Sequence, residues 1–173
     1  MVFASRYGDV ERSLESIENM VAGEPVSPAA FATSVHNSIA AMSSIARGDV
    51  EDTICIAAGT ASAAAGFVEA AALLENGAER ALLVCYDEPL PPTHASFADE
   101  APVLWAWAWL LGHACADQPA IGVRCRRRTT EDAPPPSSTQ LPAGLQVLRF
   151  FISGAGTLQQ TQDGLCWEWW RDA

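Results

Sequence analysis

The sequence is poor in charged residues and especially poor in basic ones. Charged side chains make up 18% of the 173 residues, and 10 Lys plus Arg stand against 21 Asp plus Glu, which leaves a formal net charge of −11. The resulting field repels phosphate backbones and anionic membrane surfaces, so the composition excludes a general nucleic-acid or membrane-surface binder. A hydrophobic content of 49% excludes general disorder and predicts a globular protein.

Long apolar runs are also missing. The nearest candidate, Ala57–Leu74, consists mostly of small residues and carries Thr60, Ser62 and Glu69, so it predicts a buried helix and not a membrane span. The N-terminus MVFASRYGDV lacks the basic start and the apolar stretch of a secretory signal. We therefore expect a cytoplasmic protein.

Cysteine and histidine are too sparse for a metal centre or a disulfide framework. The five cysteines form no CxxC pair and their number is odd, which argues against paired disulfides and against a four-ligand zinc site. The pair His113-Ala-Cys115 is a weak metal signal. We expect a reducing compartment, no metal and no cofactor.

The length fits a single domain over residues 1–173. Apolar periodicity and turn residues predict a chain of strands and helices in this order: strand Val2–Ser5, helix Asp9–Ala22, helix Ser27–Gly48, strand Thr53–Ala57, helix Gly59–Gly77, strand Ala81–Tyr86, strands Val103–Leu111 and Ala120–Arg128, helix Leu141–Ser153 and strand Leu165–Trp170. The first strand begins so abruptly that we expect it to be an inner strand. The Pro/Ser-rich stretch at about residues 131–140 predicts a flexible loop.

The helix Gly59–Gly77 is predicted to lie at the centre of the fold. Its side chains are small on nearly every face through Ala72, so neighbouring elements must approach its backbone closely on several sides. With the strands Thr53–Ala57 and Ala81–Tyr86, both read as buried, it forms a βαβ unit. The strands at 103–111 and 120–128 then join the same sheet in antiparallel fashion.

The turn that precedes this helix is one candidate for catalysis. A nucleophile elbow lies between a strand and a helix, but its GxSxG spacing would require serine at the position of Ala61. A structural turn is therefore the favoured interpretation, and nucleophilic use of Thr60 or Ser62 is the alternative.

Two further groups are candidates for binding. His36 and Asn37 lie off the apolar stripe of their helix, which favours a buried or interfacial polar pair over a catalytic one. Arg124, Arg126, Arg127 and Arg128 form the only basic cluster of an acidic chain. They fit either a solvated strand end paired with Glu131 and Asp132 or a docking site for a phosphopantetheine or an acidic carrier protein.

Three segments together resemble a known family. They are Ser27-Pro28 with the Phe31–Asn37 run FATSVHN, Ala57-Ala-Gly59 leading into the small-residue helix, and the run ALLVCYDEPL that begins at Ala81. These motifs are similar to those of the short β-ketoacyl-synthase-like family, which includes chain-length-factor-type subunits of aryl-polyene biosynthesis. The resemblance implies an α/β, partial thiolase-like fold, in which a mixed sheet surrounds a buried central helix with flanking helices.

The resemblance also implies a function without catalysis. The nucleophilic cysteine of active synthases corresponds to Thr60, and their acyl-activating histidines belong to a C-terminal half that this chain does not contain. We expect a non-catalytic partner of a full-length β-ketoacyl synthase, with exposed sheet edge and helix surface left for the heterodimer. Val35, Ile39 and Met42, together with His36 and Asn37, are the predicted interface and tunnel residues. The alternatives are a small acyl-thioester transferase or hydrolase and a carrier-protein docking scaffold.

Overall fold

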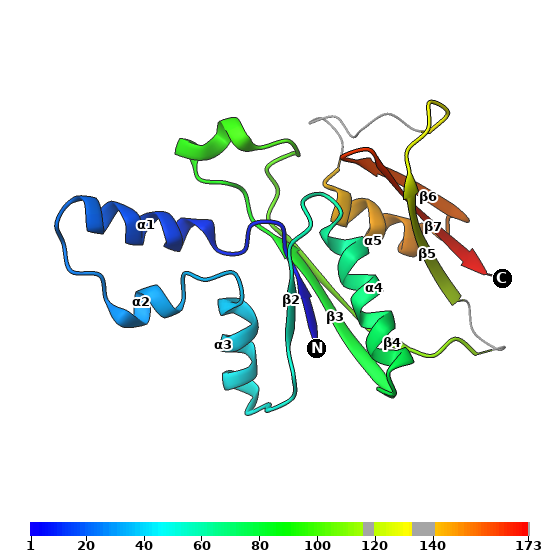
Figure 1. Cartoon of the computed structure of the whole chain (residues 1–173), viewed down its shortest axis with the longest axis horizontal. Helices are drawn as coiled ribbons and strands as arrows, with labels where there is room; N and C mark the ends of the chain where they lie inside the picture. Colours follow the sequence, from blue (N-terminus) through cyan, green and yellow to red (C-terminus); the bar gives the residue numbers. More distant parts are fainter. Residues whose placement is uncertain (116–119, 133–140, 173) are drawn as a thin grey trace.

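The computed structural model describes residues 1–115, 120–132 and 141–172, and Figure 1 shows two sheets with helices α4 and α5 between them. The helices are α1 (Val10–Val21), α2 (Pro28–Ala32), α3 (Ser38–Arg47), α4 (Ser62–Glu75), the 3₁₀ helix η1 (Pro92–Phe97) and α5 (Ala143–Ser153). The strands are β1 (Val2–Ala4), β2 (Ile54–Ile56), β3 (Arg80–Asp87), β4 (Trp105–Gly112), β5 (Ala120–Arg127), β6 (Thr157–Gln162) and β7 (Leu165–Asp172).

The first sheet is mixed, as the sequence predicts. Its strand order is β2-β1-β3-β4; β1 runs parallel to β2 and β3, and β4 runs antiparallel to β3. The predicted βαβ unit is present, although β1 lies between its two strands. The inner position predicted for β1 is confirmed. The prediction that the strand at 53–57 is buried is wrong, because β2 lies at the edge of the sheet and its residues are only half-buried.

The second sheet was not expected. Strand β5 does not join the first sheet but pairs with β7, in a separate antiparallel sheet of order β5-β7-β6. The sequence did not indicate β6 at all, because its TLQQTQ segment contains three glutamines and a single apolar residue, and lacks the aromatic, Val and Ile residues typical of strands. The predicted loop at 131–140 lies outside the described residues from position 133 onward.

Helix α4 is buried between the two sheets, as the small side chains on nearly every one of its faces predict. On one side Gly66 lies so close to β1 and β3 that an added Cβ would come within 2.8 Å of the Ala4 Cβ and 2.9 Å of the Leu83 Cδ1. On the other side the Phe67 ring packs edge-on against Trp169 of β7 at 5.2 Å. A helix that is apolar all round needs this cover on both faces, and the second sheet supplies it.

Helix α5 is also held from two directions. The Trp107 indole N–H donates to the Gly144 carbonyl over 3.0 Å, and the Trp105 ring lies where a side chain on Gly144 would be, 2.1 Å from an added Cβ. The Gln160 amide of β6 donates to the Ala143 carbonyl over 2.9 Å. The tryptophans that alternate along β4 therefore face the core, as their spacing predicts.

The single helix predicted for Ser27–Gly48 is wrong, because the chain forms α2 and α3 with a break between them. In the break the hydroxyls of Thr33 and Ser34 donate to carbonyls of the preceding turn, which competes with regular helical bonding. Ser13 of α1 donates to the Ser34 carbonyl over 2.6 Å. The predicted cap residue at the start of α2 makes no side-chain capping bond.

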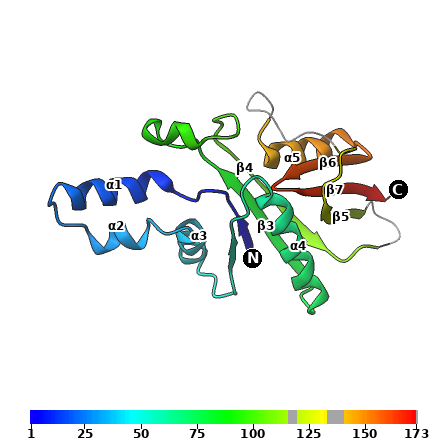
Figure 2. The ribbon, with the colours of Figure 1, turned by 45° about the horizontal axis from the view of Figure 1, so that its top comes forward.

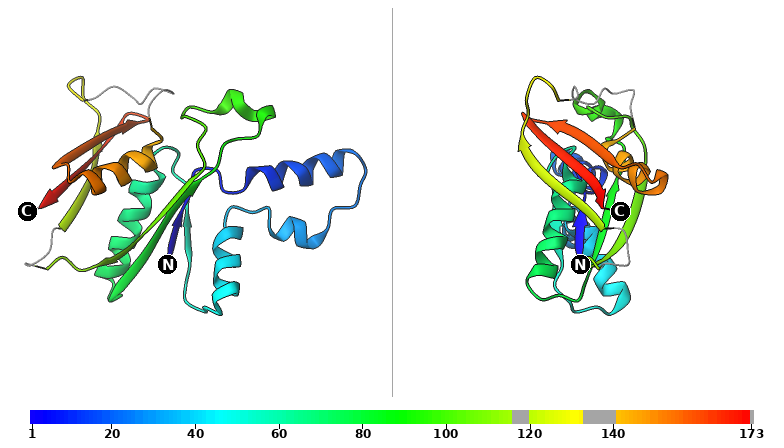
Figure 3. Two further views of the ribbon diagram at one scale, coloured as in Figure 1. Left: turned by 180° about the vertical axis from the view of Figure 1, so that it is seen from behind. Right: turned by 90° about the vertical axis from the view of Figure 1, so that its right-hand side faces the viewer.

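Helices α1, α2 and α3 form an arm that extends away from the sheets, as Figure 2 and the left panel of Figure 3 show. The apolar side chains of the arm are largely exposed: Ile17, Met20, Val21, Phe31, Val35, Ile39, Met42 and Ile45. None of the helices in the described ranges has the length and apolar character needed to cross a bilayer.

Candidate functional site

The turn between β2 and α4 carries the two hydroxyls that the sequence indicated as candidate nucleophiles, and both form hydrogen bonds within the chain. The Thr60 hydroxyl donates to the Gln162 side-chain oxygen over 2.6 Å. The Ser62 hydroxyl donates to the Gly59 carbonyl over 2.7 Å and accepts the Ala58 N–H over 3.0 Å. Gly59 has a φ of +55°, and a Cβ at this position would lie 2.1 Å from the Gln162 amide nitrogen. The hairpin between β6 and β7 thus places an amide over the turn.

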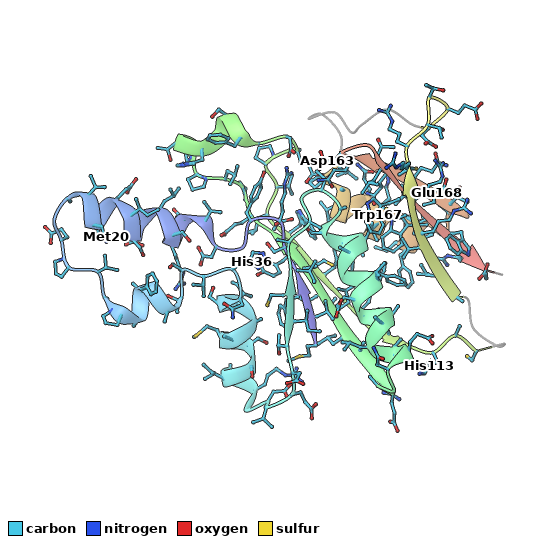
Figure 4. All side chains as sticks on the ribbon, viewed as in Figure 1. Met20, His36, His113, Asp163, Trp167 and Glu168 are labelled. Carbon is cyan, nitrogen blue, oxygen red and sulfur yellow. The ribbon has the colours of Figure 1, made fainter. Side chains whose placement is uncertain are left out.

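The three histidines lie elsewhere. His36 donates from Nε2 to the Ser5 carbonyl over 3.0 Å, and His94 is bonded to Thr93. Figure 4 shows His113 at the end of β4, beside the C-terminal end of α4 and away from the turn. Within the described part of the chain, which contains all three imidazoles, none is bonded to Thr60 or Ser62. The turn therefore lacks the hydrogen-bonded base that a serine or threonine nucleophile requires.

A buried polar network lies where β1 and β3 end. The Ser5 hydroxyl donates to Asp87 over 2.9 Å and accepts the Gly8 N–H over 2.9 Å, and the Arg6 N–H donates to Asp87 over 2.7 Å. Burial raises the pKa of the Asp87 carboxyl, and these donors counteract part of the effect. The bond from His36 to Ser5 connects the arm to this network. Ser5 and Asp87 are not among the predicted site residues, although polar residues at the carboxyl ends of parallel strands are a usable signal in the sequence.

The predicted interface residues all lie in the arm, at the break before α3 or on α3 itself. Val35, Ile39 and Met42 are 42%, 41% and 53% exposed, which is high for side chains of this kind. Asn37 is exposed and occupies the N-cap position of α3 without a side-chain capping bond. His36 is half-buried and its ring is hydrogen-bonded to the backbone just after β1, which agrees with the predicted polar and non-catalytic role.

Two of the four clustered arginines form ion pairs within the chain. Arg126 binds both oxygens of Asp132 and one oxygen of Glu168, and Arg124 also pairs with Glu168; Figure 4 shows Glu168 beneath strand β5. Arg126 holds the pKa of both carboxyls below their usual range. Glu168 replaces the predicted partner Glu131. Exposed Arg127 and Arg128 form no ion pair with any residue of the described ranges.

The carboxylates bound to Arg126 also belong to a group of residues that could hold a metal ion. Asp132, Cys166 and Glu168 place their ligand atoms within 4.8 Å of one another, which is close enough for a metal ion. However, the Arg126 guanidinium lies between the two carboxylates, and together with Arg124 it balances their charge. The cluster is therefore an ion-pair network that ties β5 to β7.

Comparisons with known proteins agree with the fold. The family profile described as "Beta-ketoacyl synthase, N-terminal domain" matches residues 1–170. A chain of the ketosynthase ApeO in complex with its chain length factor ApeC from Xenorhabdus doucetiae matches with a TM-score of 0.82 and 27% identity, over 98% of this chain and 68% of that chain. A chain of the ishigamide ketosynthase/chain length factor matches at 19% identity and a TM-score of 0.59, over 76% of this chain and 41% of that one. No curated protein sequence matches significantly. The predicted thiolase-like fold is confirmed.

Proposed function

The chain belongs to the β-ketoacyl synthase N-terminal domain family, and from that membership we propose that it is a non-catalytic, chain-length-factor-type subunit that pairs with a complete ketosynthase. The observation that carries the proposal is the closed turn before α4. A condensing enzyme needs an activated nucleophile in front of this helix, whereas here Thr60 and Ser62 are bonded to Gln162 and Gly59. This arrangement disfavours an independent acyl-thioester transferase or hydrolase that uses either hydroxyl.

A second observation supports a protein partner. Among the strands of the described residues, only β1 pairs with β2, and β2 is half-buried. The other edge of β2 therefore offers backbone groups to a partner strand. Helix α3 lies beside it in Figures 1 and 2 and presents Ile39, Met42 and Ile45 to solvent. An apolar surface of this kind next to a free strand edge is typical of a permanent interface.

The class of partner comes from the comparison. The Xenorhabdus doucetiae structure is described as a ketosynthase in complex with its chain length factor, and we assign the corresponding pairing to this chain. In the heterodimer Val35, Ile39 and Met42 would line the far end of the acyl tunnel, so that their bulk limits the length of the growing chain. The pathway class we propose is fatty-acid or polyketide-type, of the aryl-polyene kind.

A carrier-protein docking role is favoured only for part of the arginine cluster. Arg126 is occupied by Asp132 and Glu168, whereas Arg127 and Arg128 are exposed. Arginine side chains are well suited to bind phosphate and carboxylate groups. We therefore place the docking contact for an acyl carrier protein at Arg127 and Arg128.

Co-expression with a full-length β-ketoacyl synthase tests the heterodimer. We expect the two chains to purify together in equal amounts, and Ile39→Glu to abolish the pairing because it buries a charge in an apolar interface. Val68→Glu is the matched control, since Val68 is 45% exposed but lies on α4, outside the arm. A monodisperse protein with no affinity for the synthase, or equal loss in both variants, would contradict the proposal.

A further inference from the structure

A cavity of about 630 Å³ lies at the C-terminal end of α4, where the two sheets diverge. It is lined by the second half of α4, the end of β4, the start of β5 and Phe151 of α5. The catalytic-type turn lies at the opposite end of α4, so the cavity belongs to no site described above. Its volume is within the range of small-molecule sites, about 300–1,000 Å³.

The walls of the cavity are apolar and aromatic. Trp109 forms one side, with Phe151 at 4.9 Å from its ring centre and Phe67 edge-on at 6.4 Å. Ala71 of α4 and Leu111 of β4 complete the described lining near these rings. Because these side chains leave the space unfilled, an apolar molecule that displaces water from it gains hydrophobic free energy.

The charges around the cavity restrict the head group of such a molecule. Among the described residues of the lining, the ionisable oxygen and nitrogen groups are those of Glu75 and His113, and none of these residues is Lys or Arg. An anionic head group would be repelled by the Glu75 carboxylate and by the net charge of −11 of the whole chain. An uncharged hydroxyl or carbonyl head group avoids this repulsion and finds a hydrogen-bonding partner in His113.

We propose that this cavity is a binding site for an uncharged apolar molecule with a linear or aromatic tail and a small hydrogen-bonding head group. The assignment is independent of the proposed heterodimer. It excludes free fatty acids as the preferred occupants, because their carboxylate is attached directly to the tail.

Decanol and decanoate provide a matched pair of probes, since they share one tail and differ in the charge of the head group. Each is titrated below its aggregation concentration into the full chain at neutral pH, by calorimetry and by the fluorescence of Trp109 and the other tryptophans. We expect saturable binding of decanol and at least tenfold weaker binding of decanoate. Failure of decanol to bind, or equal affinity for the two probes, would overturn the assignment.

Two variants locate the binding. Ala71→Phe fills the cavity and should weaken decanol binding at least tenfold, whereas Val68→Phe places the same ring on the exposed side of α4 and should leave it unchanged. Glu75→Gln, at an exposed position that packing does not constrain, should selectively raise the affinity for decanoate. The site would be refuted if Ala71→Phe bound decanol as tightly as the wild type and Glu75→Gln kept the wild-type ratio of decanol to decanoate affinity. The two variants test the site independently, so poor folding of one of them leaves the other as a test.

Discussion

Replacement of Gly66 by alanine tests directly whether α4 lies on the first sheet at the distance described above. The new Cβ would lie 2.8 Å from the Ala4 Cβ, which is fixed to the backbone of β1, and 2.9 Å from the Leu83 Cδ1, whose side chain is fully buried. Neither group has room to move, so the helix must shift away from the sheet. Overpacking of this kind costs about 1–3 kcal/mol.

A gain in helix propensity acts in the opposite direction. Alanine is more favourable than glycine inside a helix by about 1 kcal/mol. If the packing cost lies at the upper end of its range, as two contacts near 2.9 Å to buried atoms imply, the net loss is about 2 kcal/mol. For a chain of this size each kcal/mol lowers the melting temperature by about 2–4 °C, so Gly66→Ala should melt about 4–8 °C below the wild type.

Thermal and urea unfolding followed by circular dichroism measure this loss. Val68→Ala, on the exposed side of the same helix, is the control and should change stability by no more than about 0.5 kcal/mol. A melting temperature of Gly66→Ala at or above that of the wild type would refute the close packing of α4 on β1 and β3, because propensity would then be the only effect of the substitution.

The remaining predictions concern the ion-pair network, the turn and the arm. Arg126 lowers the pKa of Asp132 and Glu168, so these carboxylates stabilise the fold above about pH 4 and the stabilisation is lost as acid protonates them; Arg126→Gln should flatten the acid side of the melting curve against pH. Thr60→Cys should give no condensing activity in a malonyl and acyl thioester assay, since a thiol there still lacks an imidazole, and measurable turnover would refute this reasoning. In the proposed heterodimer with an active ketosynthase, Met42→Trp should shorten the product chain by at least one extension unit in mass spectrometry, and an unchanged product would contradict the proposed position of Met42 in the tunnel.

The sequence predicted the elements of the first sheet because their signals are local. Helix α4 follows from a segment whose side chains are small on nearly every face, and its end follows from Asn76 and Gly77, which occupy the positions after the last helical turn in the structure. The Asp9 carboxylate caps α1 by accepting the N–H of Arg12 over 3.2 Å, which agrees with the predicted start of that helix.

The second sheet could not be predicted because its pairing is not local. Strand β5 lies about forty residues before its partner β7, and Arg124 pairs with Glu168 across that distance. The alternation in β5 indicates a strand but carries no information on which sheet it joins. The candidate site could be predicted only in part for the same reason. Thr60 was identified from its local sequence, but Gln162, which accepts its hydrogen bond, is 102 residues away.

The second sheet also changes where a partner can bind. The central helix is predicted to be covered on several sides, and the second sheet covers the face of α4 that points away from the first sheet. Here Trp169, which is 1% exposed, covers it from within the chain. The apolar surface that remains lies on the arm and beside the free edge of β2. The arm is connected to the first sheet through the bond from His36 to Ser5 and the Ser5–Asp87 network, and its apolar side chains stay exposed. A docked ketosynthase would therefore stabilise the arm more than it stabilises the body of the protein, because the body already buries its own core.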